Sequence, residues 1–238
     1  MLTPILSAAG VAAAAVGGYA YAAMWPPSQI FGRTVVAGND PDEFALTYDD
    51  GPNEPETAML LELLAEYKVH ATFFVIGRFV RQRPEIVRAI AAGGHTVGNH
   101  TMTHPKLLFC SRQQVHDELA GCNAAIEDAL GEPVRFMRCP HGMRRPDVLR
   151  TARALGLTPV QWNVTAQDWN PIGAEKILQN VERGIAHNRK RRRGSNILLH
   201  DGGQAGIGQD RKASVETTRR LLEKYAGSVR FVTPREWV

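Results

Sequence analysis

The stretch LTYDDGPN, residues 46–53, places two aspartates side by side at the end of an apolar run. The apolar residues from Phe44 to Leu46 predict a buried strand, and Gly-Pro-Asn predicts the turn that ends it. Because side chains alternate along a strand, we expect Asp49 and Asp50 to point in different directions. The pair therefore marks either a loop that caps the next helix or a functional site at the end of a strand.

The composition is that of an ordinary globular protein, with 44% hydrophobic and 22% charged residues in a chain of 238. This length is enough for one sizeable α/β domain with a terminal extension. The formal net charge is +4, but the basic run at residues 189–193 exceeds it and leaves the rest of the chain close to neutral. A nucleic-acid-binding protein needs a basic face spread over the fold, so the charge pattern argues against that class.

The first part of the chain is uncharged up to Arg33. Residues 4–24 are apolar or small and long enough to cross a bilayer, although they are rich in Ala and Gly and lack the basic start of a strong signal peptide. Ala20-Tyr21-Ala22 is similar to a small-x-small cleavage site. We therefore expect residues 1–32 to be a membrane anchor, slightly favoured, or a signal peptide, and residues 33–238 to form an extracytoplasmic domain. A helix buried in the domain is the structural alternative.

Short apolar runs alternate with amphipathic helical patterns from about residue 42 onward. The expected strands are 44–48, 71–76, 95–99, 135–139, 158–162, 196–200 and 230–232, and the expected helices lie near 55–67, 79–92, 112–130, 146–155, 174–188 and 212–226. Such alternation predicts parallel strands joined by crossover helices. About seven units fit a complete or incomplete (β/α) barrel, with a doubly wound open sheet as the alternative. In both folds, functional groups gather at the C-terminal ends of the strands.

The third expected strand runs into GNHTMTHP, in which His100 and His104 are four positions apart. On a helical turn this spacing puts both imidazoles on one face, where they can bind one metal ion. Pro105 disfavours helix at His104, so such a turn must be short. The alternative is a packed or solvated turn that binds no ligand.

Two further polar stretches follow expected strands. RCPHG, from Arg138, predicts a fixed loop whose backbone N–H groups could face a ligand, and ILLHD ends an apolar run at His200. Each stretch alone is weak, but together with the aspartates and the histidine pair they favour a site over separate structural roles. One carboxylate with two imidazoles is typical of a catalytic zinc site with open positions. A second carboxylate can take a proton from an attacking water, and a distant histidine can protonate a leaving group.

Five stretches, in order, resemble the motifs of the polysaccharide deacetylases: TYDDGP, HTMTH, RCPHG, WNVTAQDW and LLH. This family is also known as the NodB-homology domain or carbohydrate esterase family 4. The resemblance covers about residues 42–236 and implies a distorted (β/α) barrel with about seven parallel strands. It also implies a hydrolase that removes N-acetyl groups from a glycan, releasing acetate and leaving an amino sugar.

The resemblance implies a role for each motif residue. Asp50, His100 and His104 would bind one divalent metal ion, usually zinc. Asp49 would be the catalytic base, and Arg138 would hold and tune it. His200 would be the general acid for the departing amine. Three further roles follow. The backbone N–H of His141, which follows Pro140, would help to stabilise the oxyanion. Asp168 would be a partner of the catalytic histidine, and Trp169 would contact the substrate.

Two positions depart from the family's motifs. Tyr is usual where this chain has His141, but that loop acts mainly through its backbone. Asp is common where Thr165 stands, and this Asp orients the catalytic histidine, so Asp168 is the candidate replacement. The departures leave the rate and the acid role open without affecting the metal site.

The sequence does not name the glycan. Peptidoglycan and chitin oligomers, which contain N-acetylglucosamine, and acetylated xylan all suit this set of residues. The alternatives are a deformylase or deacetylase of a lipid-linked sugar, which an anchor would suit, and a protein that binds glycan without turnover. We expect a glycan as the partner, contact between the N-terminal segment and a membrane, a periplasmic or cell-surface location, and a monomer in preference to other oligomeric states.

Overall fold

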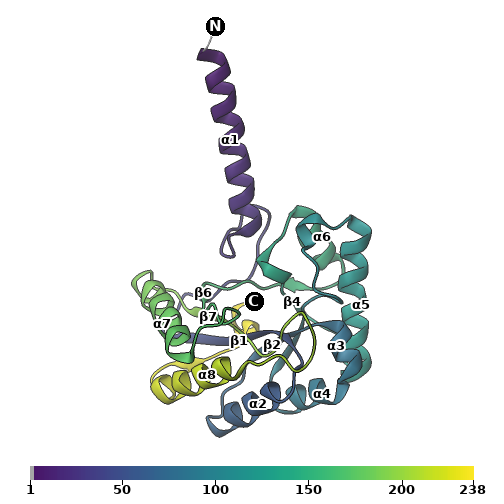
Figure 1. The fold of residues 1–238 in the computed structure, drawn as a ribbon, viewed down its shortest axis with the longest axis vertical. Coiled ribbons are helices and arrows are strands. Elements are labelled where there is room, and N and C mark those ends of the chain that lie inside the picture. The colour runs from purple at the N-terminus through teal and green to yellow at the C-terminus, as the bar shows by residue number, and fades with distance from the viewer. Residues whose placement is uncertain (1–2) are drawn as a thin grey trace.

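Residues 3–238 are described by a computed structural model, in which helices cover the outside of a curled parallel sheet (Figure 1). The sheet order is β5-β4-β3-β2-β1-β7-β6, and β8 pairs with the start of β1. The strands are β1 (Glu43–Gly51), β2 (Thr72–Val75), β3 (Thr96–Asn99), β4 (Phe136–Met137), β5 (Thr158–Pro159), β6 (Val164–Thr165), β7 (Ser195–His200) and β8 (Arg230–Phe231). This order confirms the predicted distorted barrel. Strand β1 is central and buried along its whole length.

The helices pack one apolar stripe against this sheet. They are α2 (Glu56–Glu66), α3 (Gly77–Gln82), α4 (Pro84–Ala92), α5 (Arg112–Leu130), α6 (Pro146–Ala154), α7 (Ala174–Lys190) and α8 (Lys212–Tyr225), with 3₁₀ turns η1 (Leu107–Phe109), η2 (Pro140–Gly142) and η3 (Pro234–Trp237). The start of α5 illustrates how the sequence fixes a helix boundary, because Ser111 and Gln114 form a reciprocal capping box there. Val115, Leu119, Cys122 and Ile126 then form a buried stripe, since one of them recurs at every turn of the helix.

The elements differ from the expected ones in two places. The single helix expected at 79–92 is two helices, because Pro84 starts α4 and Arg83 before it has a non-helical backbone. Strand β6 was not expected, since a strand of two residues shows no periodicity in the sequence.

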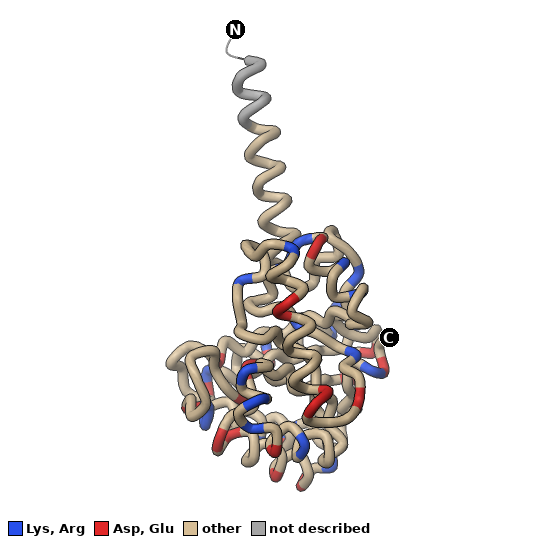
Figure 2. Tube along the Cα trace, turned by 90° about the vertical axis from the view of Figure 1, so that its right-hand side faces the viewer, with Lys and Arg blue, Asp and Glu red and all other residues tan. Residues whose placement is uncertain are grey.

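Helix α1 (Thr3–Met24) stands away from the domain, as Figures 1 and 2 show. Residues 10–21 are exposed, whereas Ala22 and Ala23 are buried where the helix meets the domain. The alternative of a helix buried in the domain is therefore wrong for residues 10–21. Among residues 3–238, no helix combines the length and the hydropathy that a membrane span requires.

Candidate active site

The end of β1 brings both aspartates to one point. The pairing of β1 with β2 shifts register between Asp49 and Gly51, and Asp50 takes a left-handed backbone with φ of 73°. Asp49 Oδ2 and Asp50 Oδ1 consequently lie 3.7 and 3.4 Å from the same atom, His100 Nε2. The expectation that alternation would separate the two carboxylates is wrong, because an extra residue in a bulge re-aims the side chains that follow it.

Glycines on two loops allow this close approach. A Cβ atom at Gly51 would lie 2.2 Å from the Asp201 carboxylate, and a Cβ atom at Gly202 would lie 2.4 Å from the Asp50 carbonyl oxygen. Neither position can carry a side chain while the loops after β1 and β7 touch. The glycines in DDGP and HDGG thus allow these two strand ends to lie in contact.

The two candidate metal-binding histidines lie in the loop after β3, which is not a helical turn as expected. Thr101 and His104 have φ values of 69° and 66°. The Asn99 side chain accepts a hydrogen bond from Thr101 N at 2.8 Å, and the Thr101 hydroxyl accepts one from His104 N at 3.0 Å. These bonds fold the loop back, so that His104 Nε2 lies 3.1 Å from Asp50 Oδ1.

The other ring nitrogens of these histidines have oxygen partners. His100 Nδ1 lies 2.9 Å from the carbonyl oxygen of Arg138, and His104 Nδ1 lies 2.7 Å from Oε1 of Gln204. Both oxygens can accept a hydrogen bond from Nδ1–H. In that tautomer Nε2 of each ring carries the free lone pair, which faces Asp50.

Asp50, His100 and His104 fit one divalent metal ion. Their ligand atoms lie within 4.8 Å of one another, and all three residues are buried. Within residues 3–238, Asp50 Oδ1 is a buried atom without a hydrogen-bond partner. Burial opposes ionisation, but when both imidazoles carry a proton on Nε2 their hydrogen bonds to the carboxylate outweigh it and hold the pKa of Asp50 well below its usual range. A carboxylate and two neutral imidazoles form a metal site with open positions.

Arg138 fixes the second aspartate. Its side chain is fully buried, and Nη1 donates to Asp49 Oδ1 at 2.8 Å and to the Thr47 hydroxyl at 2.9 Å. The guanidinium also lies over the Phe74 ring, 4.3 Å from its centroid. One carboxylate oxygen of Asp49 is thereby held, and Oδ2 remains directed towards His100.

His200 lies at the end of β7, beside β1, and its partner is Asp168. His200 Nδ1 lies 2.9 Å from Asp168 Oδ1, and Asp168 Oδ2 accepts from His200 N and the Ser214 hydroxyl, both at 2.7 Å. Burial disfavours the charged ring, but the Asp168 carboxylate outweighs it and raises the pKa of His200 to about 9. Thr165 instead accepts from Trp162 Nε1 at 2.9 Å.

The remaining candidates surround these groups. Trp169 is half exposed, and its ring meets the His200 ring edge-on with centroids 5.5 Å apart. Pro140 is buried, while His141 is exposed, has φ of 57° and places its ring centroid 4.8 Å from that of His104. Gly142 must lack a side chain, since a Cβ atom there would lie 2.7 Å from the Trp162 ring.

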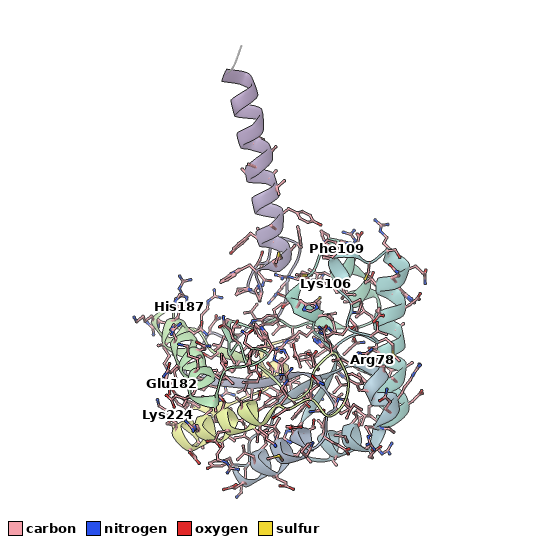
Figure 3. All side chains as sticks on the ribbon, viewed as in Figure 1. Arg78, Lys106, Phe109, Glu182, His187 and Lys224 are labelled. Carbon is pink, nitrogen blue, oxygen red and sulfur yellow. The ribbon has the colours of Figure 1, made fainter. Side chains whose placement is uncertain are left out.

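Sequence reasoning missed two residues beside the site. Gln204 contacts His104, and its backbone oxygen accepts from Arg78. Arg78 is labelled in Figure 3 and lies on α3. Asp201 is fully buried, and burial raises its pKa to about 7 although the Thr57 hydroxyl donates to it at 2.5 Å. Gln204 has no sequence signal, because its partner lies 100 positions away. Asp201 follows His200 directly in the sequence, but its burial, which raises its pKa, is visible only in the structure.

An open parallel barrel with a carboxylate and two imidazoles at its strand ends is typical of a metal-dependent enzyme. The sequence pattern of the polysaccharide deacetylases matches residues 37–160, and the chain belongs to this family.

Two curated relatives illustrate the match. A chitooligosaccharide deacetylase of Sinorhizobium fredii is 44% identical over 172 residues, which is 71% of this chain and 77% of the relative. A peptidoglycan-N-acetylglucosamine deacetylase of Bacillus cereus is 33% identical over 201 residues, 83% of this chain and 89% of the relative. A solved peptidoglycan N-acetylglucosamine deacetylase superposes with a TM-score of 0.75 at 30% identity, covering 84% of this chain and 90% of its own.

Proposed function

We propose that this deacetylase acts on glycans that contain N-acetylglucosamine, such as chitin oligomers or peptidoglycan. The observation that carries the proposal is the convergence of Asp49, Asp50, His100 and His104 at one end of the sheet, with His200 on the adjacent strand. The named activities of the relatives, on chitooligosaccharides and on peptidoglycan, support this class of substrate.

Asp50, His100 and His104 would hold the metal ion, for which we propose zinc because the ligands are one carboxylate and two imidazoles. When bound, the ion supplies Lewis-acid polarisation of the acetyl carbonyl. Asp49 Oδ2 takes a proton from the water that attacks the carbonyl carbon, while Arg138 keeps Oδ1 in place.

The remaining steps complete the hydrolysis. The backbone N–H of His141 donates to the oxygen that becomes negative. Pro140 before it stiffens the loop that carries this group, and Gly142 after it allows the left-handed backbone there. His200 gives its proton to the nitrogen as the C–N bond breaks, with Asp168 holding the ring. Trp169 borders His200 and is positioned as a wall for the sugar. The products are acetate and a free amine.

The test is acetate release from chitin oligomers and from peptidoglycan fragments, with and without a chelator. We expect release that stops on chelation and returns when zinc is added. Binding of these glycans without acetate release would instead establish a non-catalytic glycan-binding protein. Release from formylated or lipid-linked sugars alone would favour the deformylase or lipid-linked alternative.

Changing Gln204 to alanine is expected to weaken metal binding by about 10- to 100-fold, because the partner of a ligating histidine fixes its tautomer and orientation. A competitive titration with a chromogenic chelator measures the affinity. Gln179→Ala removes a surface amide that bonds Glu175 on α7, so it serves as the control. An unchanged affinity in Gln204→Ala would rule out support of His104 by this contact.

Changing Asp168 to asparagine is expected to move the alkaline limb of turnover to lower pH. A general acid must hold its proton, and the raised pKa near 9 keeps His200 protonated through neutral pH. Without the carboxylate the pKa of His200 falls, so protonated enzyme is lost at a lower pH. The pH profile of kcat measures the shift, with Thr165→Ser as the control. Identical profiles for Asp168→Asn and the parent would remove Asp168 from the acid step.

We also propose that α1 holds the enzyme at a membrane, with the domain on the extracytoplasmic side. The helix has no charged side chain, and its residues 10–21 are exposed. Exposed Tyr19, Tyr21 and Trp25 gather at its domain end, where aromatic side chains favour a membrane–water interface. Co-sedimentation of the full chain with vesicles, and its release by exchange of residues 1–22 for a polar helix, would test this placement.

A further inference from the structure

Arg144 is a buried arginine that no step of the proposed reaction uses. It is 1% exposed, and it follows two residues after Gly142 in the loop that carries His141. Nη1 donates to the carbonyl oxygen of Gly142 at 3.0 Å. Nη2 donates to three carbonyl oxygens of the segment that follows α1, those of Trp25 at 2.8 Å, Pro26 at 3.1 Å and Ser28 at 2.8 Å.

The backbone strengthens the same connection. Arg144 N donates to the carbonyl oxygen of Ala23 at 3.0 Å, and α1 packs against η2. Ala22, Ala23 and Ser28 are buried, although the helix before them is exposed. A planar guanidinium has donors in a fixed fork, so one side chain can define the positions of several carbonyls at once. Because burial of unpaired polar groups is costly, the carbonyls and the arginine depend on each other.

We infer that residues 23–28, here called the connecting segment, are part of the active site, and that Arg144 is a positioning residue that joins this segment to the loop of His141. The inference rests on the proposed role of that loop. The loop has two left-handed residues, His141 and Gly142, with φ of 57° and 67°. A backbone of this kind persists where its surroundings fix it, and the guanidinium holds the Gly142 carbonyl directly.

The first test is Arg144→Lys in the full chain. A lysine keeps the charge but cannot bridge four carbonyls, so the loop should lose its fixed position. We expect kcat to fall by about 10²-fold, the loss typical of a misplacement of about 1 Å. Metal affinity should stay unchanged, since the ligands come from the ends of β1 and β3. Arg153→Lys is the matched control, because Arg153 also donates to a carbonyl of the N-terminal segment, that of Arg33, from an exposed position.

The second test changes the connecting segment instead of Arg144. Ala23→Gln enlarges a fully buried side chain and should displace the connecting segment, whereas Ala20→Gln enlarges an exposed one on the same helix. We expect the first variant to reproduce the loss of kcat and the second to keep the parental rate. All variants are compared at a temperature at which each is fully folded, so that lost stability cannot imitate the effect.

Amide hydrogen exchange at Gly142 and Met143 gives a readout that does not depend on turnover. Faster exchange in Arg144→Lys and Ala23→Gln, with the parental pattern in the two controls, supports the inference even if the parent deacetylates none of the glycans tested. Parental kcat and parental exchange in Arg144→Lys would overturn it. So would a fall in metal affinity that matched the fall in kcat, because the effect would then come from the metal site.

Discussion

Replacing His104 by alanine is expected to abolish both metal binding and turnover. The side chain supplies one of the three ligand atoms that Asp50, His100 and His104 offer, and the remaining carboxylate and imidazole leave too few protein ligands for a catalytic divalent site. Its Nε2 lies 3.1 Å from Asp50 Oδ1, closer than that of His100. Metal content by elemental analysis and acetate release should fall together.

A surface histidine provides the control for this loss. His116 on α5 is exposed, and its Nδ1 lies 3.3 Å from the carboxylate of its neighbour Asp117. His116→Ala should keep one metal ion per chain and the parental rate. Retention of stoichiometric metal by His104→Ala would show that the ligand set has been assigned wrongly.

Replacing Asp49 by asparagine is expected to leave the metal in place and to slow turnover by about 10²- to 10⁴-fold, the usual contribution of a positioned base. The amide oxygen can still accept from Arg138 Nη1, so the fully buried guanidinium is not left without a partner. The group that is lost is the basic oxygen, Oδ2, on the side of His100.

Two measurements separate the neighbouring aspartates. Asp49→Asn should bind metal with parental stoichiometry and yield little acetate, whereas Asp50→Asn should lose both properties. Asp42→Asn, which removes a surface partner of Arg189, should behave as the parent. A near-parental rate in Asp49→Asn would remove this residue from the proton transfer.

The fold could be predicted from the sequence because strands buried on both faces and amphipathic helices each leave a period of their own. Residues at strand ends were predictable as a site for the same reason, since parallel strands bring their C-terminal ends to one edge. The relative orientation of Asp49 and Asp50 could not be predicted. It depends on a bulge and on the left-handed backbone of Asp50, and neither leaves a periodic pattern in the sequence. The partner of Gln204 and those of Arg144 lie about a hundred positions away, where only the folded chain brings them together.

If α1 anchors the enzyme to a membrane, as proposed above, the packing of α1 against the domain would determine how far the active site can reach. At 1.5 Å per residue, the 22 residues of α1 extend about 33 Å. Arg144 donates hydrogen bonds to the connecting segment after the helix, so this segment is fixed to the domain and does not act as a flexible linker. With α1 at a membrane, a catalytic centre on a flexible linker would reach substrates at many distances from the membrane surface. The centre of this enzyme would instead stay at one distance from that surface. Acetyl groups would then be removed within a thin layer, and a polymer would be modified according to its depth.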